Sequence, residues 1–365
     1  MALPRSFLRN AVRKRRKELS ASLKTAMRLP TELRCLDHSQ PLSTESQDRP
    51  VEVSSVLSCS RGCRVPVING IPRFVESENY ASAFGLQWKT FRKTQLDSHT
   101  GLTISRDRLA GALGGSLEIL NRMSVLEVGC GAGRFTELML EAGARVFACD
   151  LSTAVEANYE NCHRWPDYFV CQADVRHLPV QPQSFDFVIC LGVIQHTPNP
   201  EETIAALASH VRPGGTIVVD HYTHGYPRNF LQRNLRRMFI RLPARFAQPS
   251  AMKLARALLP LHRVTWRQQR GMWRLRSFLR RTSPLIDYYE VYPQLGRERL
   301  GEWAVLDTHD TLTDYYKHLR TTEQIEACLR SCGLVELEVY YGGNGVEARA
   351  RRPGFPAGRE MSTRA

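Results

Sequence analysis

Short apolar runs alternate with longer amphipathic stretches from residue 124 onward, and this alternation predicts the fold. The apolar runs have the length of strands and are almost uninterrupted, at residues 125–129, 144–150, 168–174, 185–191 and 215–220. Stretches with helical periodicity lie between them. Strands without polar alternation are buried on both faces, as in a parallel sheet covered by helices on each side. We therefore predict an α/β fold with a doubly wound, mostly parallel sheet.

The segments on either side of these runs also carry clear patterns. An amphipathic helix with one aromatic face is predicted by the spacing of Tyr80, Phe84, Trp88 and Phe91. This face is explained by core packing or, since the helix precedes the first buried strand, by a lid over a cofactor. A helix at 322–332 and two strands at 335–341 and 346–350 close the fold.

Upstream, Asn69-Gly70 lies between short runs of valine and isoleucine, which predicts a hairpin in a small β-rich module. The stretch from 225 to 285 has helical character, but prolines at 243, 249, 260 and 284 predict several short helices there. The resulting division of the chain is 1–30, a basic amphipathic segment; 31–76, the β-rich module; 77–123, a helical lid or linker; 124–224 and 286–352, the main domain; 225–285, a basic helical insert; and 353–365, a disordered tail.

The positive charge is concentrated in two of these segments. The net charge of the chain is +14, yet residues 1–30 alone carry +8 and residues 221–286, which contain no acid, carry +15, so the remainder sums to −9. Basic appendages on an acidic body predict contact with an anionic partner: a phosphate-bearing acceptor, the face of a membrane, or RNA. The alternative is that these are solvated helix faces.

Composition excludes several classes of protein. With 42% hydrophobic and 24% charged residues, the chain is unlike disordered, collagen-like or disulfide-scaffold proteins. No apolar run reaches the roughly 18 residues that a membrane-spanning helix needs. The first residues lack the apolar core of a secretory signal, and their arginines are also compatible with an organellar transit peptide. Seven of ten cysteines fall singly in predicted strands and helices, which indicates reduced thiols and a cytoplasmic protein, peripheral at the inner membrane face if the basic segments bind lipid.

Candidate chemistry begins at the turn after the first buried strand. Glu127 precedes three glycines, Gly129, Gly131 and Gly133, at the point where doubly wound folds bind nucleotide cofactors. Asp150 ends the second strand, 19 residues after Gly131, where a carboxylate can accept both ribose hydroxyls. A dinucleotide loop requires a third glycine at position 134, which is arginine here, and no lysine of a phosphate loop follows.

With these residues in place, the chain from 124 to 222 resembles the class I S-adenosylmethionine-dependent methyltransferases, in particular the methyltransferase type 11 group. Five motifs carry the resemblance in order: residues 125–133, 149–152, 173–179, 184–188 and 196–200. The resemblance implies a seven-stranded sheet whose last strand is antiparallel. It also implies S-adenosylmethionine as cofactor, held by Glu127, Gly129, Gly131, Gly133, Asp150, Leu151, Asp174, Val175 and Leu191.

The acceptor side is indicated by residues beyond the cofactor motifs. His196 follows the fourth strand at the expected mouth of the site, where an imidazole would serve as general base or position the acceptor. A second segment, from Asp307 to His318, resembles the acceptor side of a narrower group, the bacterial methyltransferases that carry an N-terminal zinc-ribbon-like module. Together with Trp88 from the aromatic helix, it gives the candidate substrate residues Trp88, Asp307, Asp310, Tyr315 and His318.

The β-rich module carries a possible metal site. Cys35 and His38 form one short knuckle and Cys59 and Cys63 another, about twenty residues apart, as in a zinc ribbon with one cysteine replaced by histidine. Relatives with such a zinc-ribbon-like module usually have cysteine at the position of His38. Bound zinc and a metal-free ribbon held by apolar residues both remain open at this stage.

Three functions fit these observations. The first is a methyltransferase acting on a hydroxyl, or on nitrogen or carbon, of a small or carrier-linked metabolite such as a sugar or glycan precursor. The second is a tRNA or rRNA methyltransferase that uses the basic insert, although no motif for a base amino group is present. The third is a non-catalytic scaffold or activator, which would be expected to have lost the glycine loop or Asp150, and both are intact.

Overall fold

The computed structural model describes residues 29–44, 54–76, 78–224, 229–266 and 271–354. The segment 1–28 and the end of the chain from 355, for which we expect a basic amphipathic segment and a disordered tail, lie outside the described residues. Within the described part, no helix is both long and apolar enough to cross a bilayer.

The main domain is built on a seven-stranded sheet in the order β10-β11-β9-β8-β5-β6-β7. Strands β5 to β9 are mutually parallel, and β11 runs antiparallel between β9 and β10. The strands are β5 (Ser124–Val128), β6 (Arg145–Asp150), β7 (Tyr168–Gln172), β8 (Phe185–Cys190), β9 (Val211–His221), β10 (Val335–Gly342) and β11 (Gly345–Arg351). The doubly wound, mostly parallel sheet predicted from the sequence is confirmed.

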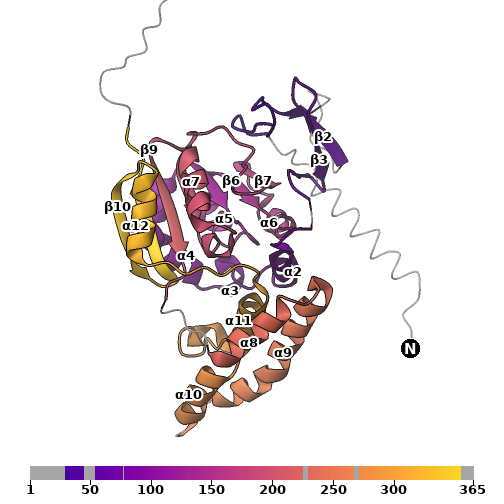
Figure 1. Cartoon of the computed structure of the whole chain (residues 1–365), viewed down its shortest axis with the longest axis vertical. Helices are drawn as coiled ribbons and strands as arrows, with labels where there is room; N and C mark the ends of the chain where they lie inside the picture. The colour runs from indigo at the N-terminus through magenta and orange to yellow at the C-terminus, as the bar shows by residue number, and fades with distance from the viewer. Residues whose placement is uncertain (1–28, 45–53, 77, 225–228, 267–270, 355–365) are drawn as a thin grey trace, which may run out of the picture.

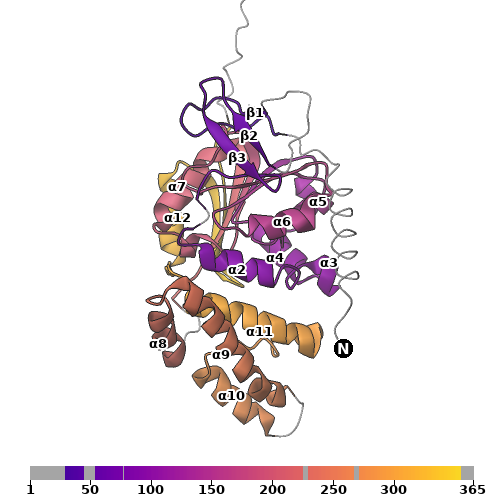
Figure 2. The same cartoon turned by 90° about the vertical axis from the view of Figure 1, so that its right-hand side faces the viewer.

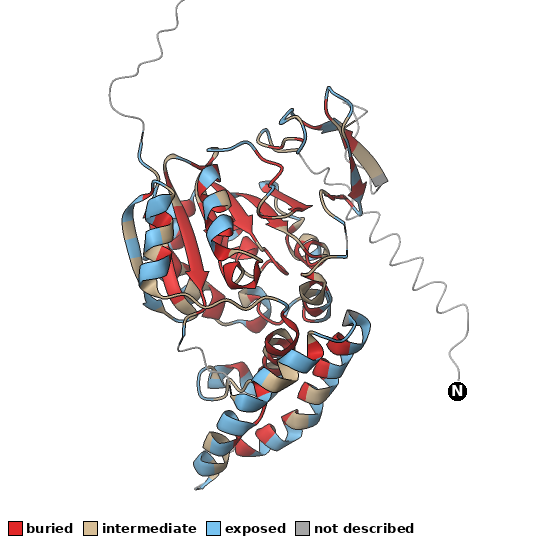
Figure 3. Ribbon diagram, viewed as in Figure 1, coloured by how far each residue is buried: buried red, intermediate tan, exposed pale blue. Residues whose placement is uncertain are grey.

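Helices cover both faces of this sheet because its central strands are apolar on both sides. Every residue of β5 and β7 is buried, and the sheet forms the red centre of Figure 3. The covering elements are α4 (Ile104–Leu113), η1 (Leu117–Leu120), α5 (Thr136–Glu141), α6 (Val155–Cys162), η2 (Ile194–His196), α7 (Pro200–His210) and α12 (Thr322–Ser331). Among the α-helices of this set, α7 and α12 begin with side-chain caps, from Asn199 and Thr321 respectively.

A small antiparallel sheet precedes the main domain. It consists of β1 (Ser43–Thr44), β2 (Ser54–Ser58), β3 (Arg64–Ile68) and β4 (Ile71–Pro72), paired in that order. Asn69 and Gly70 both have positive φ, 54° and 79°, which is the geometry of a type I′ hairpin turn and confirms the predicted hairpin. The sheet lies beside β6, β7 and α6 in Figure 1, and Phe74 N donates to Gln172 O at 2.8 Å.

A helical arm projects from the domain. It contains α8 (Phe230–Phe239), α9 (Ala244–Thr265) and α10 (Met272–Thr282). The helices α2 (Ser82–Thr90), α3 (Asp97–Thr100) and α11 (Gly296–Thr313) lie between arm and sheet in Figure 2, and η3 (Pro293–Leu295) directly precedes α11.

The helix α9 corrects one expectation, because it continues for 22 residues through Pro249 and Pro260. Both prolines are exposed. We attribute the continuity to this exposure, since the carbonyl groups that lose their intrahelical partner can be solvated on an outer face.

Candidate active site

The glycine loop after β5 is shaped by close approaches to other elements. Gly129 and Gly131 have φ of 76° and 50°, a region that favours glycine. A Cβ at Gly129 would lie 2.2 Å from Val193 Cγ2, and one at Gly131 would lie 3.2 Å from the indole of Trp88. Both glycines line the main cavity. Gly133 does not line it, because its missing Cβ faces Cys162 Sγ at 3.0 Å, so this glycine serves the packing of the loop on α6.

A buried chain of hydrogen bonds holds this loop from beneath. The Thr136 hydroxyl donates to Glu127 Oε2 at 2.5 Å, and Asn158 Nδ2 donates to Thr136 Oγ1 at 2.9 Å and to Cys130 O at 3.2 Å. The chain ends at Tyr168, whose hydroxyl donates to Asn158 Oδ1 at 2.7 Å. Burial raises the pKa of Glu127 to about 8, against the opposing effect of the Thr136 hydrogen bond. Glu127 does not line the cavity, so the structure places it as a support of the loop.

Asp150 joins the loop to the end of β6. Its Oδ2 accepts from Gly131 N at 3.0 Å, and its Oδ1 accepts from the backbone and hydroxyl of Ser152 at 2.8 and 2.7 Å. Burial raises the pKa of Asp150, while these hydrogen bonds act in the opposite direction. Asp150 and Leu151 both line the cavity, where the carboxylate is available to a pair of vicinal hydroxyls.

The remaining predicted cofactor residues divide into two groups. Val175 and Leu191 line the cavity. Asp174 does not, and its carboxylate forms an ion pair with Arg176 at 2.6 Å. The Arg176 hydrogen bonds lower the pKa of Asp174 although partial burial alone would raise it.

The cavity has a volume of about 690 Å³ and extends from the glycine loop to α2, α4 and α11. Its walls are rich in aromatic side chains, which come from both sides of the space: Tyr80, Phe84, Trp88, Phe135, Tyr222, Tyr288, Tyr292 and Trp303. Of the aromatic face predicted from the sequence, Tyr80, Phe84 and Trp88 therefore line the cavity, whereas Phe91 packs in a hydrophobic cluster with residues of α9 and α11. Polar and charged side chains also line it, and a cavity that combines apolar walls with polar groups able to orient a ligand is typical of small-molecule sites.

His196 lines this cavity and is oriented by groups on its far side. Its Nδ1 lies 3.1 Å from the carbonyl oxygen of Tyr316 and 3.4 Å from Asp314 Oδ2. A carbonyl oxygen only accepts, so we assign the proton of the neutral imidazole to Nδ1, which leaves Nε2 as an acceptor. The ring of His196 is held by Phe84 and Tyr222, with ring centroids 5.3 and 5.4 Å away.

Sequence reasoning missed Asp314, which organises this part of the site. Asp314 is buried and accepts from Arg236 Nε at 2.6 Å, with Lys317 Nζ at 2.7 Å from its other oxygen. The spacing of Asp307, Asp310 and Asp314, three and four residues apart, was an available signal, since such positions share one face of a helix.

Of the other predicted substrate residues, two line the cavity and two do not. Asp307 and Asp310 line the cavity from α11, whereas Tyr315 and His318 do not, and Tyr315 is exposed. Burial raises the pKa of Asp307 to about 7, against a hydrogen bond from Tyr288. Asp310 Oδ1 is buried and has no hydrogen-bond partner among the described residues. Two arginines that we did not predict as site residues, Arg108 and Arg134, also line the cavity.

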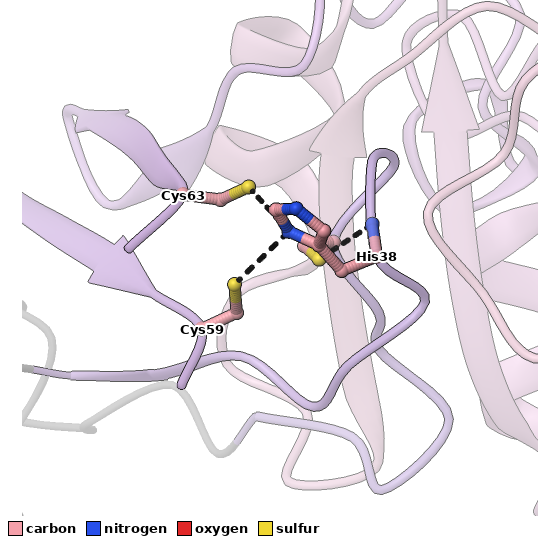
Figure 4. Close-up of side chains that lie close together, drawn as sticks. His38, Cys59 and Cys63 are labelled. Atoms are coloured by element: carbon pink, nitrogen blue, oxygen red, sulfur yellow. Dashed lines mark hydrogen bonds between the residues drawn. The ribbon is translucent and has the colours of Figure 1, made fainter. Parts of the chain in front are cut away.

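The four predicted metal ligands meet in the N-terminal module. One ligand atom each from Cys35, His38, Cys59 and Cys63 lies within 4.8 Å of the others. Figure 4 shows Cys59 and Cys63 pointing toward the His38 ring, with Sγ to Nδ1 distances of 3.8 and 3.1 Å. Three thiols and one imidazole are a donor set that suits tetrahedral zinc. The residues present therefore fit a zinc ion.

Comparisons with known proteins agree with this geometry. Residues 126–219 match a family model described as a methyltransferase domain. The ubiquinone biosynthesis O-methyltransferase of Azoarcus sp. (strain BH72) is 37% identical over 98 residues, 26% of this chain and 41% of that protein. The enzyme of the same name from Idiomarina loihiensis is 38% identical over 97 residues, 26% of this chain and 40% of the other. The chain thus spans about two fifths of the length of these relatives.

Solved structures show weaker similarity. A Haloferax volcanii complex of the Trm112 methyltransferase activator with a methyltransferase aligns with a TM-score of 0.40 and 13% identity over 76% of this chain and 99% of that chain. The Haemonchus contortus phosphoethanolamine N-methyltransferase 2 in complex with S-adenosyl-L-methionine aligns at 0.36 and 13% over 64% and 49%. Scores at this level say nothing about the acceptor.

Proposed function

Because residues 126–219 form a class I S-adenosylmethionine-dependent methyltransferase domain, we propose that the whole chain transfers a methyl group to a hydroxyl oxygen of a small or carrier-linked metabolite, such as a sugar or glycan precursor. The cofactor supplies the electrophilic methyl group and leaves as the demethylated thioether. Gly129, Gly131, Asp150 and Leu151 would hold it at the end of the sheet.

The observation that carries the choice of oxygen is the orientation of His196. A hydroxyl acceptor must lose its proton as the O–CH3 bond forms and the S–CH3 bond breaks. With Nδ1 turned to Tyr316 O and Asp314, His196 has Nε2 available for that proton. The imidazolium that results is stabilised by Asp314, as an acid behind a catalytic histidine does in other enzymes.

The cavity also favours a polar acceptor with several hydroxyl groups. Asp310 has a buried carboxylate oxygen without a partner among the described residues, and leaving such an atom unpaired is costly. A hydroxyl of the acceptor would satisfy it. The aromatic walls provide flat surfaces for a ring, which aromatic side chains contact favourably.

The experiment has two stages. Calorimetric titration with S-adenosylmethionine and its demethylated product, beside NAD, should show micromolar binding of the first two alone. Hydroxylated acceptors, beginning with phosphorylated and lipid-linked sugars, are then screened for methylation. His196→Ala should lower kcat strongly at unchanged cofactor affinity, while His177→Ala, an exposed histidine outside the cavity, should not. Folded protein that binds no S-adenosylmethionine refutes the function, and unchanged kcat in His196→Ala refutes the base.

We further propose that the cluster of Cys35, His38, Cys59 and Cys63 binds a structural zinc ion. The supporting observation is the convergence of four donors from two knuckles on one point. Zinc there would tie the loop before β1 to the turn between β2 and β3, and it lies outside the residues that line the cavity. Its contribution is therefore to the stability of the module.

A further inference from the structure

Exposed apolar side chains are concentrated on the helical arm. Among the described residues, half of the large hydrophobic side chains with high exposure lie between residues 230 and 278, and they are Phe230, Leu231, Met238, Leu242, Phe246, Leu261, Val264, Trp273 and Phe278. Phe230 is 74%, Trp273 64% and Phe278 61% exposed. Exposed apolar side chains in such number mark an interaction surface. Figure 3 shows the pale blue outer faces of these helices, away from the sheet.

The helix α8 shows how these side chains are arranged. Its inner face is packed, since Phe239 is buried in a cluster with Ala247, Ala251 and Leu312. At about 100° per residue, the exposed residues occupy one arc of about 160° on the other side. That arc contains Phe230, Leu231, Arg233, Arg237 and Met238. Apolar and cationic side chains therefore share one solvent face, which is the composition of an interfacial helix.

The helix α10 has the same character. Leu279 is buried, while Trp273, Arg274, Phe278 and Arg281 are exposed. The Arg274 guanidinium lies 5.5 Å from the centroid of the Trp273 ring. Such a pair places a cation beside an amphipathic ring that is suited to the boundary between headgroups and acyl chains.

The positive charge of the arm is largely uncompensated. No acid occurs between residues 221 and 286. The acids that follow pair with Arg236, Arg276 and Arg280, through Asp314 and Glu290. Eight exposed cations form no ion pair within the described part of the chain: Arg233, Arg237, Arg241, Arg245, Lys253, Arg256, Arg274 and Arg281. Their natural counter-charge is an extended anionic surface.

We propose that the outer faces of α8 and α10 dock the protein onto the surface of an anionic lipid bilayer, with the arginines at the phosphate groups and Phe230, Trp273 and Phe278 below them. RNA would also attract the arginines, and its bases would stack on aromatic rings. The exposed aliphatic side chains Leu231 and Met238, in the same arc as Arg233, favour lipid, because they gain by entering the acyl boundary and cannot stack on bases.

Docking of this face would also bring lipid close to the cavity. Glu290 is held by Arg276 at 3.4 Å and Arg280 at 2.7 Å, both on α10. The next residue, Val291, is 59% exposed and lines the cavity. An acceptor anchored in the bilayer thus meets the rim of the cavity beside the docked helix. This consequence alone rests on the proposed function, whereas lipid binding does not.

The test uses the full chain and vesicles. Co-sedimentation is measured with vesicles of phosphatidylcholine alone and of phosphatidylcholine mixed with phosphatidylglycerol, at low and high salt. We expect binding to the anionic vesicles only, reduced by salt, and weakened about fivefold by each of Arg233→Gln and Arg237→Gln. Trp273→Ala with Phe278→Ala should weaken it at least as much. Matched controls are Arg330→Gln on α12 and Tyr341→Ala on β10, which are also exposed.

The outcomes separate the alternatives. Absence of binding to anionic vesicles, or binding that the arm variants leave unchanged, overturns the proposal, and the second result would assign binding to other basic residues such as those of segment 1–30. Binding of a fluorescent single-stranded RNA that is weakened by Trp273→Ala with Phe278→Ala, together with no binding to vesicles, would show that the partner of the arm is RNA and not lipid. S-adenosylmethionine affinity, measured in the same variants, should stay constant, so that failure of docking is distinguished from failure of the cofactor site.

Discussion

Glu127 should make the stability of this protein fall as the pH rises, and replacing it with glutamine should remove that fall. The carboxyl group lies beneath the glycine loop, buried, with the Thr136 hydroxyl 2.5 Å from Oε2. Burial raises its pKa from 4.5 to about 8. Between these values the folded chain keeps a proton that the unfolded chain has lost. The stabilisation is therefore complete below about pH 4.5 and is lost as the pH rises through about 8.

The magnitude follows from the two pKa values. Each pKa unit corresponds to about 1.4 kcal/mol, so the carboxyl group accounts for a loss of about 3 kcal/mol in the free energy of unfolding between about pH 5.5 and about pH 8.5. Glutamine is neutral throughout and can still accept from Thr136. The free energy of unfolding of Glu127→Gln should thus rise by about 3 kcal/mol relative to that of the natural protein between the acidic and the alkaline end.

Urea unfolding followed by circular dichroism, at both pH values and without cofactor, measures this difference. The natural chain contains other groups that titrate, so the comparison is the change with pH of the difference between the two proteins. Glu118→Gln, at an exposed glutamate of η1, is the matched control and should show no such change. If the difference between Glu127→Gln and the natural protein is the same at both pH values, the burial argument is wrong.

Three further predictions concern the site and the N-terminal module. Asp150→Ala should weaken S-adenosylmethionine binding by about 1.5–3 kcal/mol in calorimetry, which is the scale of a lost hydrogen bond to a charged group, whereas Ser152→Ala should change the binding much less. If Asp150→Ala binds S-adenosylmethionine as tightly as the natural protein does, Asp150 is not part of the site. Asp314→Asn should lower the free energy of unfolding by about 3–5 kcal/mol, because Arg236 and Lys317 lose a buried counter-charge, and stability unchanged in thermal denaturation would contradict the ion-pair geometry. Chelation of metal, or Cys63→Ser, should release about one zinc per chain and lower the melting temperature without changing S-adenosylmethionine affinity, while Cys332→Ser, at the end of α12 and outside the Cys/His cluster, should do neither. Purified protein without zinc that melts cooperatively would refute the metal site.

Much of the fold was predictable because its signals are local. Uninterrupted apolar runs give buried parallel strands, and the turn after β5 requires glycines whose backbone lies in the left-handed region. The hairpin at Asn69 and Gly70 is predictable for the same reason. In each case the residues that carry the signal are neighbours in sequence, so their conformational preferences act without help from the rest of the chain.

The roles of individual residues in the site depended on contacts that no local pattern contains. Gly129, Gly131 and Gly133 look alike in the sequence, yet they face Val193, Trp88 and Cys162 respectively, and the third does not line the cavity. Asp174 ends a strand as Asp150 does, but Arg176 pairs with its carboxylate away from the cavity.

The sequence by itself thus determined the sheet, the loop and the cofactor class, and it pointed to the four cysteine and histidine side chains that converge in the N-terminal module. Only the tertiary structure decided which groups contact the Nδ1 atom of His196. Its Nδ1 meets the backbone of Tyr316, 120 positions away, and Arg236 from the arm fixes the neighbouring Asp314. The physical reason is that a buried charge is tolerated only where partners from distant segments surround it. The packing of α8, η2 and α11 brings those partners together, and the periodicity of apolar residues along the chain does not specify that packing.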